Sequence, residues 1–157
     1  MLMSQKLFDA IRNEDVATVT TLLDMNPKLV HEKDQRGSTP LLLATYYGFE
    51  SITEALLKCE QNLDAQDAAG NTALMGVCFK GFENIARLLI EDGANINTTN
   101  SNGATALIFA AMFNKVSLIA LLLENGADIG LKDDKGNTAL DHARMQGLKE
   151  VAAMLLD

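Results

Sequence analysis

The side chains of this chain that could do chemistry are two histidines, two cysteines and a few adjacent acidic residues. His31 and His142 could bind a metal or move a proton, but they lie near opposite ends of the sequence. We interpret each as a surface or hydrogen-bonded histidine. Cys59 and Cys78 lack the close spacing of metal-binding or redox cysteines. We interpret both as ordinary buried or half-buried thiols, while the sequence leaves a disulfide between them open.

The adjacent acidic residues do not form a metal-binding pattern. Glu91-Asp92 and Asp133-Asp134 lack the alternating oxygen ligands of a calcium loop. We interpret the first pair as a solvated helix end and the second as part of a turn. The chain also contains no Gly-x-Ser-x-Gly, phosphate-binding glycine loop or His-Glu-x-x-His motif. The sequence therefore predicts no catalytic residue, no metal site and no cofactor.

Charge and hydropathy exclude further classes of partner. The 157 residues include 13 basic and 21 acidic side chains, which gives a net charge of −8. A nucleic-acid-binding protein usually has a basic face, and an anionic membrane surface also attracts cations. No apolar run approaches the roughly 18 residues of a membrane span, and residues 1–6 do not begin a secretion signal. We expect a cytoplasmic protein that binds neither nucleic acid nor membrane.

The strongest pattern in the sequence is a period of 33 residues. Glycines recur at this spacing, a threonine follows each glycine by two residues, and a leucine follows each threonine by two more. The glycines are Gly37, Gly70, Gly103 and Gly136. A fixed period of this length indicates a stack of repeated modules rather than one irregular core.

The third module shows what each repeat must build. Thr72 suits a helix N-cap, so a first helix is predicted at about 73–80. Gly81 would end it in the left-handed conformation, and a second helix is predicted at about 83–91. In the next module Asn114 replaces this glycine, which is consistent because asparagine also tolerates that conformation. Helices this short are unstable alone and must bury their apolar faces against neighbouring modules.

This reasoning predicts a single domain of five units. The middle units span 34–66, 67–99 and 100–132. The first unit, 1–33, and the last, 133–157, depart from the pattern and are predicted to cap the two ends of the stack.

Several segments resemble the ankyrin repeat. They are Thr39-Pro40-Leu41-Leu42-Leu43-Ala44, Gly93-Ala94-Asn95-Ile96-Asn97 and Gly126-Ala127-Asp128-Ile129. The resemblance covers essentially the whole chain. It implies an all-α solenoid in which each unit contributes two antiparallel helices and a projecting β-hairpin-like loop.

Two departures from the ankyrin pattern concern local structure. The histidine of the family pattern is replaced by Leu42, Met75, Ile108 and Asp141, which removes its usual hydrogen bond to the threonine. Glu60 stands where later units have Gly93 and Gly126, so this helix end must close differently or store strain.

The resemblance also indicates where a partner would bind. In similar proteins, the two residues before the mid-unit glycine face a concave groove. Here six of these eight residues are aromatic or methionine, and such side chains often anchor protein interfaces. The eight residues are Tyr46, Tyr47, Phe79, Lys80, Met112, Phe113, Met145 and Gln146. The alternative is that some of them fill gaps between neighbouring helices, whereas Phe49 and Phe82 are expected to pack in the core or on the convex side.

The loop tips are polar and would border this groove. Arg36, Asn71 and Asn102 are candidate partner contacts, although turn formation alone also explains such residues. The sequence thus predicts a non-enzymatic protein-binding module, monomeric, with a partner it does not name. One alternative is a homodimer formed through the apolar surface. A ligand carrier or enzyme would need an enclosed pocket, for example beside Asp141, His142 and Arg144.

Overall fold

The computed structural model describes residues 2–156 and is helical throughout, without strands in that range. The first helices of the successive units are α1 (Met3–Arg12), α3 (Pro40–Tyr46), α5 (Ala73–Lys80), α7 (Ala106–Met112) and α9 (Ala139–Met145). The second helices are α2 (Val16–Met25), α4 (Glu50–Leu57), α6 (Glu83–Glu91), α8 (Val116–Glu124) and α10 (Lys149–Met154). A short 3-10 helix, η1 (Pro27–His31), follows α2.

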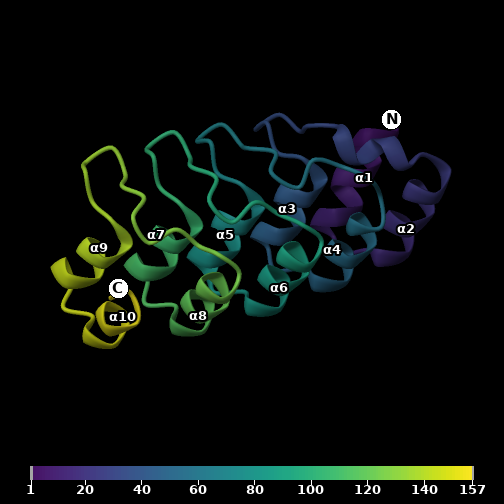
Figure 1. Ribbon diagram of the computed structural model, residues 1–157. Helices are drawn as coiled ribbons and strands as arrows, with labels where there is room; N and C mark the ends of the chain where they lie inside the picture. The colour runs from purple at the N-terminus through teal and green to yellow at the C-terminus, as the bar shows by residue number, and fades with distance from the viewer. Residues whose placement is uncertain (1, 157) are drawn as a thin grey trace.

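The helices form two parallel rows, with the loops projecting from one side (Figure 1). Each first helix packs against its own second helix and against the first helix of the next unit. The second helices contact one another in the same order, from α2 to α10. This confirms the predicted solenoid of stacked helix pairs, while the boundaries assigned to the units remain a prediction.

The threonine of each repeat starts a first helix, as predicted. The hydroxyls of Thr39, Thr72, Thr105 and Thr138 each accept a hydrogen bond from the backbone N–H three residues later, at 3.1 to 3.3 Å. These bonds satisfy N–H groups that have no partner within the helix. Pro40 occupies the first position of α3, where its missing N–H has no cost.

The four residues that replace the histidine of the ankyrin pattern differ in whether they restore a hydrogen bond to the threonine of the cap. Asp141 Oδ2 accepts a hydrogen bond from the Thr138 N–H at 2.9 Å, which completes a reciprocal cap at α9. Met75 Sδ lies 3.5 Å from the Thr72 N–H, a weaker version of the same contact. Leu42 and Ile108 have no polar group that could make it, and they are buried instead.

The predicted helix ends are also confirmed. Gly81 and Asn114 both have the left-handed conformation, with φ of 90° and 57°. At the end of α4, Glu60 does not adopt it. Instead, the side-chain amide of Gln61 donates hydrogen bonds to the carbonyls of Leu56 and Cys59, at 2.7 and 3.2 Å. This helix end closes differently, as expected, through a side chain rather than through a glycine.

The core runs the length of the stack between the two rows of helices. Leu41, Leu74 and Leu107 occupy the same position in successive units, and all three are buried. Burial of one such side chain contributes about 1.5–3 kcal/mol. In the last unit, Asp141 and Arg144 stand where the middle units bury apolar or small residues, and neither is buried. The last unit therefore presents a polar surface at its outer end, as a capping repeat requires.

The loops are closed turns joined to one another. In each loop the first side chain accepts hydrogen bonds from two backbone N–H groups within the same turn, at 2.9 to 3.0 Å; these residues are Asp34, Asp67, Asn100 and Asp133. The Ser101 N–H donates to the Ala69 carbonyl, and the Asp134 N–H donates to the Asn102 carbonyl. These bonds connect the loops of the last three units, so their tips form a continuous platform beside the first helices.

Candidate partner-binding surface

Most of the residues predicted to contact a partner lie at the exposed ends of the first helices. Five of them keep 40 to 62% of their surface accessible: Tyr46, Tyr47, Phe79, Phe113 and Met145. Lys80 and Gln146 are exposed as well, whereas Met112 is half-buried and packs against the core. We call these eight residues the aromatic strip. The alternative that they fill gaps between helices fits Met112 best.

The rings of the aromatic strip contact one another. Phe79 and Phe113, from successive units, meet edge to face with centroids 4.6 Å apart. Tyr46 and Tyr47 are 5.7 Å apart in a similar arrangement, and Tyr47 stacks on Phe49 at 5.6 Å. Such pairs are favourable beyond the area they bury and restrict ring motion. The strip therefore presents aromatic side chains that are already held in position.

A fixed register relates one unit to the next. The Lys80 ammonium lies 4.5 Å from the centroid of the Tyr46 ring, in a cation–π contact. Phe113 lies against Phe79 in the equivalent position one unit later. In both cases the second strip residue of one unit covers the first strip residue of the unit before it. This arrangement keeps the Lys80 charge over the strip.

A neighbouring row of residues was missed in the sequence. Leu43, Gly76, Phe109 and His142 each precede the strip by one helical turn and share its face. All four are half-buried. Counting back three and four residues from the strip would have identified this row. We call it the floor row.

Two of the three predicted loop contacts remain accessible. Arg36 and Asn102 are exposed at their loop tips. Asn71 is half-buried, and its side-chain oxygen accepts a hydrogen bond of 2.8 Å from the Asn100 amide of the next loop. Asn71 therefore also joins two neighbouring loops. Phe49 and Phe82 are half-buried and pack against the core, in line with expectation.

Comparison with known protein families agrees with this architecture. A model described as ankyrin repeats (3 copies) matches residues 7–100, and one described as ankyrin repeats (many copies) matches residues 89–143. The chain belongs to the ankyrin repeat family. Ankyrin repeats are generally protein–protein interaction modules. A search of the curated proteins found no match for this ankyrin repeat protein.

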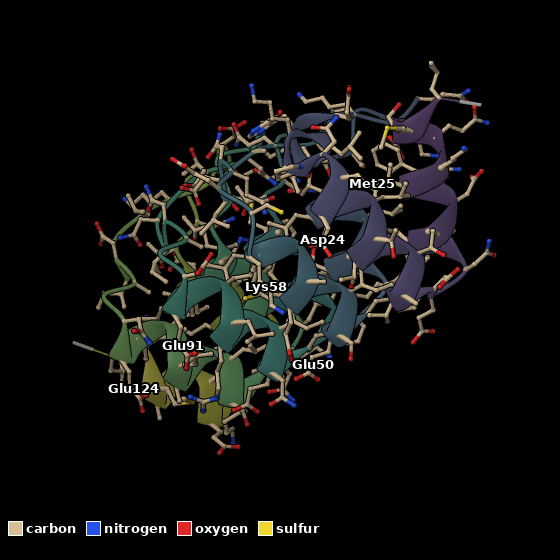
Figure 2. All side chains as sticks on the ribbon, turned by 90° about the vertical axis from the view of Figure 1, so that its right-hand side faces the viewer. Asp24, Met25, Glu50, Lys58, Glu91 and Glu124 are labelled. Atoms are coloured by element: carbon tan, nitrogen blue, oxygen red, sulfur yellow. The ribbon has the colours of Figure 1, made fainter. Side chains whose placement is uncertain are left out.

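Exposed charges differ between the two sides of the ankyrin stack. The tips and the strip carry the exposed cations Arg36, Lys80 and Lys135 and one exposed carboxylate, Asp134. The second helices and their ends are mainly acidic, as Figure 2 shows for Asp24, Glu91 and Glu124, which follow the same line along the stack as Lys58. Their other exposed acids include Asp15, Glu50, Glu54, Asp92 and Glu150. Arg87 on this side is paired with Glu83 at 3.2 Å.

Of the two histidines in the ankyrin units, one is hydrogen-bonded and the other is exposed. His142 Nε2 lies 2.7 Å from Asp133 Oδ2, so it is a hydrogen-bonded histidine, while His31 is exposed. Burial raises the pKa of Asp133, but hydrogen bonds from His142 and from two backbone N–H groups outweigh it and lower that pKa. The carboxylate is therefore held ionised within the turn.

Neither cysteine is activated as a nucleophile. Both are free thiols, so the disulfide that the sequence left open is not formed. Burial raises the pKa of Cys78 to about 12. Burial, and secondarily the charge of Asp24, also raises the pKa of the half-buried Cys59 thiol. A reactive cysteine needs the opposite shift.

Two open cavities of about 330 and 270 Å³ lie at the ends of α4 and α6, and both are lined by Leu57, Lys58 and Asp92. Neither includes Asp141, His142 or Arg144. Over residues 2–156, no three His, Cys, Asp or Glu side chains are grouped to hold a metal ion. Within the same range no helix is long and apolar enough to cross a bilayer.

Proposed function

We propose that this ankyrin repeat protein is a non-enzymatic module that binds a partner protein through its aromatic strip and loop tips. The observation that carries this proposal is the exposure of four aromatic rings and Met145 on one side of the stack. Large apolar side chains gathered on a surface are typical of binding sites, because their exposure to water is unfavourable unless a partner covers them. Aromatic residues in particular contribute most to the affinity of protein interfaces.

The residues divide into two groups by the contact they would make. The apolar anchors are Tyr46, Tyr47, Phe79, Met112, Phe113 and Met145. The polar contacts at the border are Arg36, Asn71, Lys80 and Asn102. An apolar centre with a polar border is the usual composition of a protein interface.

Charge and cysteine chemistry support the rest of the proposal. A net charge of −8 disfavours nucleic acid and anionic membranes as partners. The two unpaired thiols fit a reducing compartment, which supports a cytoplasmic location. We propose a monomer. A homodimer formed through the aromatic strip is the competing possibility, and the experiment below separates the two.

The test compares two double variants of the full chain. Tyr47→Ala with Phe113→Ala removes two anchors, and Met25→Ala with Leu156→Ala removes two exposed apolar residues elsewhere. Proteins captured from the native cell by the wild type are identified and quantified by mass spectrometry. Two interface anchors together contribute enough that the strip variant should lose its specific partner about 100-fold. The control variant should retain it.

Folding and assembly are checked on the same samples. Circular dichroism should give equal helix content for both variants, and light scattering should give a monomer over a wide concentration range. If the folded strip variant captures the same proteins as the wild type, the assignment of this surface is wrong. A dimer that dissociates only in the strip variant would support self-association instead.

A further inference from the structure

The two cavities at the ends of α4 and α6 share part of their lining. Leu57, Lys58 and Asp92 line both, so the cavities adjoin and form one groove, which we call the second-helix groove. Their volumes of about 330 and 270 Å³ are near the lower end of the range for ligand sites, roughly 300–1,000 Å³. A groove of this size suits one or two side chains of a peptide.

The groove lies where the second unit departs from the repeat. Glu60 and Gln61 stand where the next unit has Gly93 and the buried Ala94. Both Glu60 and Gln61 line the larger cavity. The sequence of this unit therefore differs from the repeat at residues that shape the groove.

Part of the groove lining is apolar. Leu57, Leu63 and Leu88 contribute to it, and all three are half-buried. Leu57 and Leu63 also pack against the core, which holds them in position. Because a half-buried leucine loses its remaining contact with water when an apolar group covers it, the groove favours an apolar side chain of a partner.

The charged part of the lining is mainly acidic. It contains four carboxylates and one cation, Lys58, and none of these five charges belongs to an ion pair within residues 2–156. The carboxylates are Glu54, Glu60, Glu91 and Asp92. Figure 2 shows Lys58 and Glu91 at the ends of neighbouring second helices. The C-terminal ends of α4 and α6 add partial negative charge there, so the groove favours cations.

The charges next to the groove do not cancel this excess. Asp24 on α2 contributes, after burial, to the raised pKa of Cys59, which places a further carboxylate near the groove. Arg87 on α6 is already paired with Glu83 at 3.2 Å. The chain as a whole carries −8. The field of the whole protein therefore also attracts a basic partner.

The carboxylates of the groove suit several separate cations rather than one metal ion. Over the described part of the chain, no three acidic, His or Cys side chains are grouped to hold a metal ion. The cations of Lys and Arg lie at the ends of long side chains, so a peptide can reach carboxylates that are spread along a groove. Apolar lining and dispersed carboxylates together indicate a basic peptide segment that contains an apolar residue.

We propose that the second-helix groove binds a basic segment of a second partner protein. One apolar side chain of this segment lies over Leu57, and its Lys or Arg side chains pair with the carboxylates of the lining. No residue of the aromatic strip lines either cavity. The inference therefore goes beyond the proposed function and does not depend on it. A chain with both surfaces joins two different proteins.

The first test uses a displayed library of random peptides without cysteine. The full-length wild type serves as the target, and an unrelated acidic protein removes peptides that bind any negative surface. Enriched peptides should contain more Lys and Arg than Asp and Glu, together with an aromatic or large aliphatic residue. One enriched peptide is then synthesised for the measurements below.

Charge variants test whether this peptide binds in the groove. Glu54→Gln with Glu91→Gln should weaken its binding about tenfold at low salt, because two charge pairs are lost. Glu124→Gln with Glu150→Gln is the matched control, since it neutralises two exposed carboxylates that line neither cavity. The control should bind as the wild type does. Lys58→Gln should strengthen binding about threefold, because it removes the cation of the lining.

Cys59 reports whether the peptide occupies the groove. It lines the larger cavity and is half-buried, whereas the other cysteine, Cys78, is fully buried. A maleimide therefore reacts with Cys59 in the folded protein. At a peptide concentration of about ten times the Kd, this reaction should slow about tenfold, because only the free protein reacts.

The outcomes separate this inference from the proposed function. A library without basic peptides, equal weakening by the groove variant and its control, or unchanged labelling of Cys59 would overturn the groove as a binding site. Basic peptides that lack an apolar residue would overturn the contact over Leu57. Tyr47→Ala with Phe113→Ala should bind the peptide as the wild type does. Loss of binding in that variant would place the peptide on the aromatic strip, which contradicts this inference and leaves the proposed function in place.

Discussion

The first and second helices are built by the same repeat, yet the residues at equivalent positions outside the core differ in kind. At one recurring position of the first helices the residues are Tyr46, Phe79, Met112 and Met145. At a recurring position of the second helices they are Glu54, Arg87, Ala120 and Ala153. The first set is large and apolar throughout, and the second is charged or small.

The second helices follow the requirements of folding and solubility. Ile52, Leu56 and Leu89 are buried against the core, and charged residues occupy much of the opposite surface. The first helices bury an equivalent set, including Leu74 and Leu107, but add large apolar residues on their exposed face. Burial in the core does not account for these exposed residues, and contact with water disfavours them. The difference between the two rows is therefore the strongest indication of a binding surface.

The largest expected effect separates the inward and outward sides of a single helix. Leu74→Ala removes a buried side chain of α5 and should lower the free energy of unfolding by about 2–5 kcal/mol. Phe79→Ala, on the exposed side of the same helix, should lower it by about 1 kcal/mol, mostly through the lost contact with Phe113. Urea denaturation of both variants measures the difference. An equal loss for the two would mean that the strip is part of the core.

Much of the fold could be predicted from the sequence because helix ends and repeat spacing follow local rules. A threonine cap, a left-handed glycine and a fixed period determine where α5 and α6 begin and end, and these bounds match those expected. The same rules identified Asn114 as the left-handed residue of its unit. In a solenoid each unit contacts only its neighbours, so local patterns determine the overall fold.

The features that were not predicted from the sequence depend on contacts that no local pattern specifies. The hydrogen bond between Asn71 and Asn100 joins two units, and neither residue alone indicates it. The Gln61 side chain that closes α4 substitutes for a missing glycine in a way that the sequence left open.

A smaller effect, on the association rate, should distinguish a charge on the first-helix row from one on the second-helix row. Lys80→Glu reverses a cation within the aromatic strip, and Lys58→Glu reverses one among the acidic residues beyond α4. For the partner identified by capture, Lys80→Glu should change the association rate about tenfold at low salt, because a charge at the border of an interface acts mainly on the association rate. Lys58→Glu should change this rate little. Surface plasmon resonance at several salt concentrations measures both rates, and an equal change for the two variants would contradict the proposed placement of the partner on the strip.

The smallest expected effect concerns the carboxylate of Asp141, in the first helix of the last unit. Hydrogen bonds from the Thr138 backbone N–H and hydroxyl lower the pKa of Asp141 below its ordinary value of 3.8. A carboxyl whose pKa is lower in the folded than in the unfolded state stabilises the fold at pH values above its unfolded-state pKa. This stabilisation is lost as the pH falls through its folded-state pKa. Acid should therefore weaken the cap of α9. Asp141→Asn should make stability less dependent on pH below about 4, because asparagine carries no charge to protonate.

The matched control for this effect lies on the second helices. Glu124→Gln removes an exposed carboxylate at the end of α8 that makes no ion pair within residues 2–156. Its thermal unfolding should follow the wild type between pH 7 and about pH 3. Hydrogen exchange at low pH should show earlier loss of protection in α9 than in α5, because the cap of α9 depends on a carboxylate and that of α5 does not. Equal protection of the two helices in acid would show that the Asp141 cap does not stabilise the last unit.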